Sequence, residues 1–482
     1  MVAHRSLQKV YRATPFTGLI SLDGTAMAGN DPAMVPRVTS RGLRACIALM
    51  LALVLATCAS SGDSVRERAS QYGLNFTDQD IELVNSVIAR IISNSLTESS
   101  SDDLIEMALV SIRDAKDIPA DRTRIDVGLN DMLKKVDEYA DYLNPERTKR
   151  MRDRLRGNFE GIGIFIGERN DRITVVSPIE GSPAMDAGLK PEDWITEIDG
   201  TTTEGLTVTE AASLLRGKRG TSVTVTVVRG SEAPKNYSIT RALITVPTAS
   251  SKRIGDIGYV RLTTFTETTE PGLEEAVNEL VLDPNGAPKG FILDLRNNPG
   301  GLASQATQVA DAFLENGLIW SSVGRNGEGR RNNNATPGDI ALGRPLVILQ
   351  NRGSASSSEI VAGGLRGNER AVILGTRSFG KGVAQTHFRL GSDLGMLKLT
   401  TMRFYQPDGT SNDKTGLQPD ILVLQPNDEK DNDNHPLKGE AAGEKCPVVS
   451  NSEPDDYQLR CAVALIRSGG VPAFLALYGA GS

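Results

Sequence analysis

The chain has 482 residues, 48 glycines, four cysteines and a formal net charge of −7 at pH 7. A chain of this length exceeds what one hydrophobic core usually organises, so we expect two or three domains. The net negative charge argues against a nucleic-acid partner held mainly through phosphate contacts. The histidines are His4, His387 and His435, which nearly excludes a metal site built from several histidines. We expect neither a metal nor another cofactor.

Residues 1–58 have the layout of a secretory signal. Two arginines precede an unbroken apolar run, Ala45–Ala56, which is too short to span a bilayer. The tetrapeptide Leu55–Cys58 resembles the lipobox at which bacterial lipoproteins are cleaved and acylated, although Thr57 replaces the usual small residue. We therefore expect location on the periplasmic side of a bacterial cell envelope, with Cys58 as the candidate lipid anchor and the only membrane contact. Simple cleavage that releases a soluble protein is the alternative.

Residues 59–156 are predicted to form a helical region. Thr77–Asp80 offers a helix cap before apolar residues at helical spacing, and a second amphipathic helix is expected from Asp102. Apolar stripes of this kind are more typical of packing or dimer surfaces than of ligand sites. We therefore expect a homodimer.

Residues 157–245 change to short strands separated by glycine turns. The loop Gly161–Ile164 leads into an apolar strand, Ser182–Leu189 has the proline and glycine positions of a short helix, and Thr207–Glu210 is a capping box. The alternating strand Ser222–Val228 closes the unit. This ordered set resembles a PDZ domain of the circularly permuted bacterial kind, which is mainly β.

The PDZ resemblance implies a mode of peptide binding. An extended peptide would add to the edge strand that follows the glycine loop, and loop N–H groups would hold the terminal carboxylate. The helix after Thr207 would line the other wall with small residues. The implied peptide-binding residues are Gly161, Ile162, Gly163, Ile164, Val208 and Ala212. The expected partners are therefore proteins with apolar carboxyl-terminal tails.

Strands and helices alternate through residues 246–425, which predicts an α/β core. The buried-looking strand Gly290–Leu295 ends in a turn that contains Gly300 and Gly301. A plain strand-to-helix turn would explain these glycines; the functional interpretation is a backbone that approaches a reacting carbonyl closely. A further strand, Leu346–Leu349, enters a serine-rich helix start, where converging N–H groups are suited to stabilise an oxyanion.

Ser356 and Lys381 are the candidate nucleophile and base. A serine hydroxyl is a poor nucleophile until a base takes its proton, and a lysine must lower its pKa by roughly three units to serve near neutral pH. Gly380 and Gly382 would let the backbone pack tightly around Lys381. Gln385 is neutral and could accept a hydrogen bond from the amine without the negative charge that would keep it protonated.

Other interpretations of these residues stay open. Ser356–Glu359 is also an ordinary capping box, and a lone lysine such as Lys381 is more often a surface cation. His387 lies on the same strand face as Gln385 and is a rival base. A second class of function also fits the sequence, namely a peptide-binding scaffold whose catalytic groups are idle.

Motifs from about Tyr142 to Ile421 together resemble the carboxyl-terminal processing peptidases, also called tail-specific proteases. The motifs are Tyr142–Glu146, Asp294–Gly301, Ser354–Ile360, Phe379–Gln385 and Tyr405–Gly409. The resemblance implies a serine endopeptidase with a crotonase/ClpP-like core, an inserted PDZ domain and a Ser-Lys dyad. Exported proteins would be its substrates, and an adaptor protein is a further candidate partner.

The same resemblance assigns roles to individual residues. Ser356 would be the nucleophile, Lys381 the base, and Gln385 the residue that orients the base. The oxyanion donors would be the backbone amides of Gly301 and Ser357. Ser357 stands where alanine is common in the family, a mild change because only its N–H is needed.

Residues 426–482 are predicted to form an acidic linker followed by a helix over Asp456–Arg467. Cys446 and Cys461 lie in this part of the chain. In an exported protein these two cysteines could close a short disulfide loop, and two unpaired thiols are the alternative.

Overall fold

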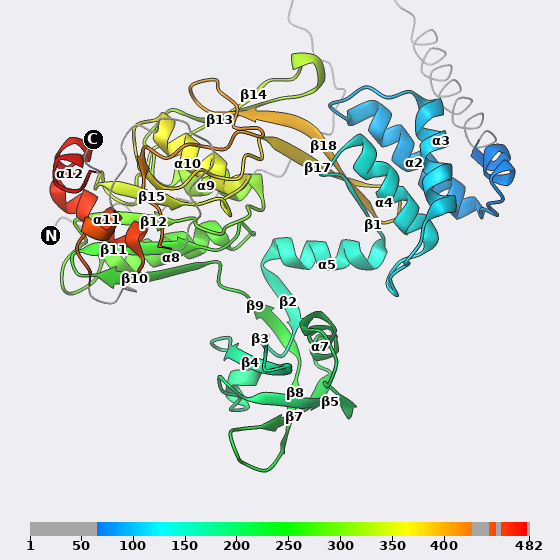
Figure 1. Ribbon diagram of the computed structural model, residues 1–482, viewed down its shortest axis with the longest axis horizontal. Helices are drawn as coiled ribbons and strands as arrows, with labels where there is room; N and C mark the ends of the chain where they lie inside the picture. Colours follow the sequence, from blue (N-terminus) through cyan, green and yellow to red (C-terminus); the bar gives the residue numbers. More distant parts are fainter. Residues whose placement is uncertain (1–64, 427–442, 450–454, 480–482) are drawn as a thin grey trace, which may run out of the picture. The chain divides into compact units, whose positions relative to one another are not determined.

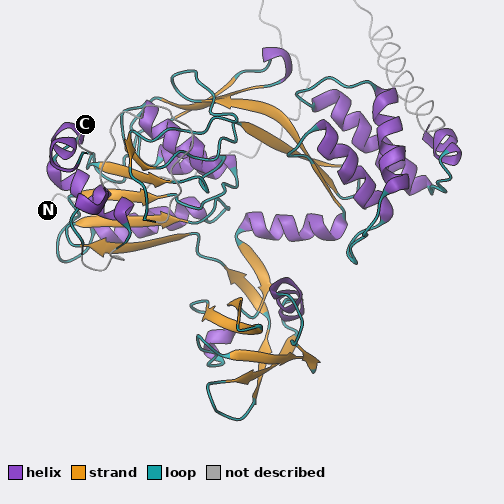
Figure 2. Ribbon diagram, in the orientation of Figure 1, coloured by secondary structure: helices purple, strands orange, loops and turns teal. Residues whose placement is uncertain are grey.

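The computed structural model describes residues 65–426, 443–449 and 455–479 (Figures 1 and 2). The expected signal segment, Cys58 and most of the acidic linker lie outside these residues. Within the described ranges, no helix combines the length and the apolar character needed to cross a membrane.

The region before residue 157 consists of helices and one short strand. In chain order these are α2 (Asp78–Asn94), α3 (Ser101–Asp114), α4 (Arg124–Val136), β1 (Asp141–Leu143) and α5 (Pro145–Arg156). The helix cap expected near Thr77 is present as a capping box, in which the Asp80 N–H donates to the Thr77 hydroxyl and the Thr77 N–H donates to the Asp80 carboxylate. This reciprocal pairing satisfies two N–H groups that would otherwise lack partners at the start of α2.

The apolar faces of α2, α3 and α4 pack into one hydrophobic core. Leu397 and Leu399 from the much later strand β18 (Met396–Tyr405) belong to the same core. Strand β1 also pairs antiparallel with β18, with Tyr142 opposite Leu397. The helical region therefore shares both a core and a sheet with residues near position 400.

Residues 158–245 form a strand-rich unit. Its elements are β2 (Asn158–Gly161), β3 (Ile164–Arg169), β4 (Arg172–Pro178), α6 (Pro183–Asp186), β5 (Trp194–Ile198), β6 (Thr201–Thr202), α7 (Val208–Leu215), β7 (Ser222–Val228), β8 (Lys235–Thr240) and β9 (Ala242–Thr245). The main sheet has the order β3-β4-β5-β7-β8, so β3 lies at one edge. Helix α7 packs against β3. Strands β2 and β9 pair separately, with Asn158 opposite Thr245.

The α/β core contains a six-stranded sheet of order β10-β11-β12-β15-β16-β19, in which every pair except β10-β11 is parallel. The strands are β10 (Ala249–Ile254), β11 (Ile257–Leu262), β12 (Gly290–Asp294), β15 (Leu346–Gln350), β16 (Val372–Gly375) and β19 (Ile421–Leu422). One face packs on α8 (Thr269–Val281), α9 (Ala303–Asp311) and α10 (Ser357–Gly367). Strand residues alternate between faces, and the other face packs on α11 (Tyr457–Ser468) and α12 (Val471–Tyr478). That this core is crotonase/ClpP-like stays a prediction.

A second sheet joins distant parts of the chain. It has the order β1-β18-β13-β14, with β17 also paired to β18; the remaining strands are β13 (Leu318–Val323), β14 (Arg331–Asn334) and β17 (Val383–Arg389). Strand β14 lies in a stretch rich in Gly, Asn and Arg and pairs antiparallel with β13. Its side chains are polar and mostly exposed, so no apolar alternation marks the strand.

The C-terminal part returns to the six-stranded sheet. Cys446 and Cys461 form a disulfide that joins the residues after the short helix η2 (Gly443–Lys445) to α11. Of the two alternatives that the sequence leaves open, the structure therefore contains the disulfide. The expected helix is present, one residue later at each end than Asp456–Arg467, because Asp456 is its cap.

Candidate active site

Ser356 occupies the tight turn between β15 and α10. Its backbone has φ 56° and ψ −110°, a left-handed conformation that is unfavourable for a residue with a Cβ. Backbone strain of this kind persists only where the surroundings enforce it, and it is concentrated at functional sites. Here the Ser354 hydroxyl donates to the Leu295 carbonyl and the Ala355 N–H donates to the Asn298 carbonyl, so the turn is fastened to the end of β12.

Gly300 and Gly301 lie directly against this turn. A Cβ on Gly300 would be 2.9 Å from the Cβ of Ser356 and 3.0 Å from the nitrogen of Ser357, and a Cβ on Gly301 would be 2.1 Å from the Phe265 carbonyl oxygen. Only glycine permits so close an approach. The N–H groups of Gly301 and Ser357 have no acceptor among the residues that the structure describes. Two free donors beside a strained serine are what oxyanion stabilisation requires.

Glu359 connects the serine turn with the lysine turn. Its side chain is fully buried on α10, and it accepts hydrogen bonds from the backbone nitrogens of Ser356 (2.7 Å), Gly380 (2.8 Å) and Lys381 (2.9 Å) and from the Ser378 hydroxyl. The nitrogens of Ser356 and Lys381 donate to the same oxygen, Oε2. The capping-box pattern predicts only the first of these contacts, and nothing in the sequence indicates the other three.

The backbone nitrogen of Lys381 shares the Glu359 carboxylate with that of Ser356, but the Lys381 amine lies against the ring of Tyr139. Nζ lies 4.9 Å from the ring centroid of Tyr139, and among the described residues it makes no hydrogen bond with the Ser356 hydroxyl. Burial, and then the positive charge of Lys398, lower the pKa of Lys381 to about 8, against the opposing effect of Asp137 and other carboxylates. A contact between an ammonium and an aromatic ring stabilises the cation without adding a charge.

Gln385 belongs to a chain of hydrogen bonds that begins in the helical region. Its Nε2 donates to the Thr400 hydroxyl at 3.2 Å, and the Thr400 hydroxyl and N–H both donate to the Asp137 carboxylate. No hydrogen bond joins Gln385 to Lys381 in the described part of the chain. Asp137 and Tyr139 are site residues that the sequence analysis missed, because they precede β1 and reach the site only through its pairing with β18.

His387, the rival base, lies two residues after Gln385 on β17. Its Nε2 is buried without a hydrogen-bond partner, and burial together with the charges of Lys398 and Lys381 lowers its pKa. No carboxylate forms a hydrogen bond or ion pair with it among the described residues, and Glu359 joins the serine turn to Lys381 and not to His387. The described ranges also contain no group of three or more His, Cys, Asp or Glu side chains suited to hold a metal ion.

The candidate peptide-binding residues surround the edge strand of the strand-rich unit. Gly161 ends β2, Ile164 begins β3, and Gly163 between them has φ 80°, where a Cβ would lie 2.3 Å from the Cβ of Ser182. The buried Ile162 anchors the loop in the hydrophobic core of the unit. The remaining two, Val208 and Ala212, are half-buried on α7, the helix that packs against β3.

Glu359→Gln is expected to lower the free energy of unfolding by about 2–4 kcal/mol. The amide keeps one acceptor oxygen, but its NH2 group would face backbone donors that the carboxylate now satisfies. Urea denaturation followed by circular dichroism measures the loss. Glu279→Gln, at an exposed position on α8, is the matched control and should change stability by no more than about 0.5 kcal/mol. Equal stability of the two variants would contradict this role for Glu359.

Comparison with known proteins identifies two domain families in the chain. Residues 256–423 match the model of peptidase family S41, and residues 174–229 match that of the PDZ domain. The PDZ match lies within the strand-rich unit, and the S41 match covers the turns of Ser356 and Lys381.

Similar proteins of known description are proteases. A carboxy-terminal-processing protease of Bartonella bacilliformis is 41% identical over 367 residues, which cover 73% of this chain and 84% of the relative. A probable CtpA-like serine protease of Staphylococcus aureus is 35% identical over 360 residues, covering 73% and 67%. A solved photosystem II D1 C-terminal processing protease is 27% identical, with a TM-score of 0.45 and coverage of 72% and 94%. The chain therefore belongs to the carboxy-terminal-processing proteases, serine hydrolases of peptidase family S41 that here carry a PDZ domain.

Proposed function

We propose that Ser356 and Lys381 form the catalytic dyad of this protease, and that its PDZ domain binds the carboxyl-terminal tails of its substrates. The observation that carries the proposal is the shared Glu359 carboxylate, to which the Ser356 and Lys381 nitrogens both donate at Oε2. This arrangement fixes the backbones of nucleophile and base on either side of one atom. We infer that rotation about side-chain bonds then brings the Lys381 amine to the Ser356 hydroxyl.

In this scheme the neutral Lys381 amine removes the proton of the Ser356 hydroxyl as Oγ attacks the scissile carbonyl carbon. The carbonyl oxygen becomes an oxyanion that accepts hydrogen bonds from the Gly301 and Ser357 amides. The lysine ammonium then gives its proton to the departing amine, which leaves an acyl-enzyme ester on Ser356. Water, deprotonated by the same amine, hydrolyses the ester and restores the serine.

The surroundings of Lys381 support its role as the base. An ordinary lysine is almost entirely protonated at neutral pH, whereas a pKa of about 8 leaves roughly one-tenth of the amine neutral at pH 7. Gln385, held by Thr400 and Asp137, leaves its Oε1 free among the described residues to accept a hydrogen bond from the amine once Nζ leaves Tyr139. The contact with Tyr139 is then the resting position of the base.

Ser356→Ala and Lys381→Ala are each expected to lower kcat by at least ~10³-fold while the protein stays folded, because each removes one half of the proton-transfer pair. Hydrolysis of an unfolded protein substrate measures the rate, and circular dichroism verifies the fold. Ser392→Ala and Lys289→Ala, both at exposed positions, are the matched controls. Substantial activity in either dyad variant would refute the assignment.

The pH dependence of kcat/KM is expected to follow the neutral form of Lys381. Activity should rise roughly tenfold per pH unit below the pKa of about 8 and level off above it. Lys398→Gln removes a positive charge that disfavours the ammonium, so the pKa of Lys381 rises, the midpoint moves to higher pH and activity at pH 7 falls. Lys289→Gln, at an exposed position, should leave the midpoint unchanged. If the midpoint of the pH profile stays unchanged in Lys398→Gln, this would argue against Lys381 as the titrating base.

The PDZ domain supports recognition of a carboxyl-terminal tail. Strand β3 is an edge of the sheet, and a tail can extend that sheet through backbone hydrogen bonds. At the start of β3, the Gly163 carbonyl is occupied by the Ser182 hydroxyl and the Ile179 N–H, which holds the preceding loop in a fixed shape. Apolar tail side chains would then contact Val208 and Ala212 on α7.

Ala212→Glu is expected to raise the Kd for a peptide with an apolar carboxyl-terminal tail by tenfold or more, because a charge would enter the wall facing the tail. Fluorescence anisotropy with a labelled peptide measures the change, and the same peptide with an amidated end should bind weakly to the unmodified protein. The matched control is Asn236→Glu, on exposed β8 at the opposite edge of the sheet. Equal affinities of the two variants would exclude this groove.

We further propose that the protease acts on exported proteins at the periplasmic side of a bacterial cell envelope, anchored through Cys58. The sequence pattern of residues 1–58 supports this location. A homodimer formed through the helical region and delivery of substrates by an adaptor are parts of the same proposal. The mass of the mature protein tests the anchor. A mass that includes acyl chains on Cys58 would support it, and a mass without them would contradict it.

A further inference from the structure

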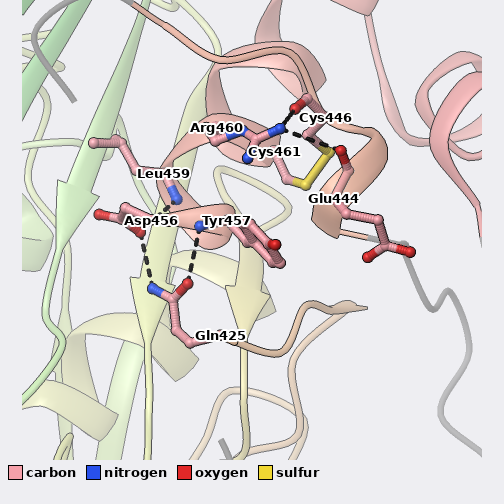
Figure 3. Close-up of a disulfide and its surroundings, with 8 residues drawn as sticks. All are labelled: Gln425, Glu444, Cys446, Asp456, Tyr457, Leu459, Arg460 and Cys461. Carbon is pink, nitrogen blue, oxygen red and sulfur yellow. Dashed lines mark hydrogen bonds between the residues drawn. A yellow bond between two sulfur atoms is a disulfide. The ribbon is translucent and has the colours of Figure 1, made fainter. Parts of the chain in front are cut away.

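The start of α11 forms a hydrogen-bonded junction outside the part of the chain that matches the peptidase family (Figure 3). The Asp456 carboxylate caps α11 by accepting the Leu459 N–H at 3.1 Å, and it also accepts the Gln425 Nε2 at 2.9 Å. Gln425 in turn accepts the Tyr457 N–H. These contacts join the chain after β19 to the first turn of α11.

The same carboxylate reaches the core through Arg296. Two hydrogen bonds join them, Nη1 to Oδ1 at 2.7 Å and Nη2 to Oδ2 at 3.0 Å. On its other side Arg296 donates to Asp294, a fully buried residue that also accepts the Tyr259 hydroxyl and an Arg261 hydrogen bond. The guanidinium thus lies between two carboxylates, one from the end of β12 and one from the C-terminal segment.

The residues that follow Arg296 are those that carry the candidate oxyanion donor. Asn298 accepts the Gly300 N–H through Oδ1, and its carbonyl accepts the Ala355 N–H at 3.0 Å and the Ser358 hydroxyl at 2.8 Å. Arg296 directly precedes this turn, in which Asn297 and Asn298 are also hydrogen-bonded and which leads to Gly301 and contacts the serine turn.

The disulfide holds the segment that supplies Asp456. Cys446 and Cys461 are fully buried, and Cys461 lies on α11 five residues after Asp456. Beside it, Arg460 donates to the carbonyls of Glu444 and Cys446, as Figure 3 shows. Helix α11 is consequently attached to the sheet by apolar packing and to the residues after η2 by a covalent bond.

We propose that Asp456 is a positioning residue for the oxyanion turn, acting through Arg296, and that the Cys446–Cys461 disulfide keeps it in place. The C-terminal segment then contributes to catalysis by holding the turn that carries Gly301. This inference rests on the proposed function in one respect, the role of Gly301 as an oxyanion donor. Because that donor acts on the transition state, loss of Asp456 should lower kcat and leave KM nearly unchanged.

Asp456→Asn tests the proposal with the least disturbance. Asparagine caps helices as well as aspartate does, so α11 keeps its first turn, but the amide NH2 would face the Nη2 donor of Arg296. The expected result is a fall in kcat of about tenfold or more with KM within about twofold. An unchanged kcat, or a rise in KM alone, would overturn the proposal.

The matched control lies at the other end of the same helix. Arg467 of α11 donates twice to Asp256, which is half-buried and precedes β11. Asp256→Asn weakens the attachment of α11 without touching Arg296, so it should leave kcat unchanged even where it lowers Tm as much as Asp456→Asn does. If both variants lower kcat in proportion to their loss of Tm, Asp456 is merely structural and the proposal fails.

The double variant Cys446→Ser with Cys461→Ser tests the disulfide. It should lower kcat, as Asp456→Asn does, with KM again nearly unchanged. A wild-type kcat in the double variant would overturn the role of the disulfide; the role of Asp456 would then be decided by Asp456→Asn alone. Ser356→Ala separates failure of the proposed dyad from failure of the positioning role. Activity retained in Ser356→Ala would remove the proposed dyad, whereas an inactive Ser356→Ala beside a fully active Asp456→Asn would remove only the positioning role.

Discussion

The buried carboxylate of Glu359 is the constraint on which the rest of this site depends. An ionised group in the interior is tolerated only when its oxygens are fully hydrogen-bonded, and here four donors from two separate turns supply the bonds. Satisfying one charge therefore brings Ser356 and Lys381 together. One donor comes from the serine turn and three come from the lysine turn, so the carboxylate joins the two turns.

The charges around Lys381 are balanced so that the amine is neither freely protonated nor wholly neutral. Burial and Lys398 lower its pKa, and Asp137 and Glu359 oppose them. Asp137 also fixes Thr400, so one carboxylate limits the shift in pKa and holds the neighbouring hydrogen-bond chain. The aromatic ring of Tyr139 contributes attraction for the cation without contributing charge. Asp137 and Tyr139, both from the helical region, thus contribute to the environment of the Lys381 amine alongside Lys398 and Glu359.

Local patterns in the sequence were enough to predict much of the fold and part of the site. The turns that carry Ser356 and Lys381, the glycines beside them and the capping boxes all depend on residues close together in the chain. Asp137 and Tyr139 could not be found in this way, because β1 meets β18 across more than two hundred residues and no local pattern encodes that pairing. Asp456 was hidden for the same reason: its partner Arg296 is 160 residues away. The roles of the dyad itself stay a prediction.

The paired strands β2 and β9 have an implication for how such enzymes diversify. The PDZ unit leaves and rejoins the remainder of the chain at adjacent points, with Asn158 opposite Thr245. A module attached through neighbouring ends can be replaced by another without stretching the polypeptide on either side. Evolution, or a protein engineer, could thereby graft a receptor of different sequence preference onto an unaltered hydrolytic scaffold.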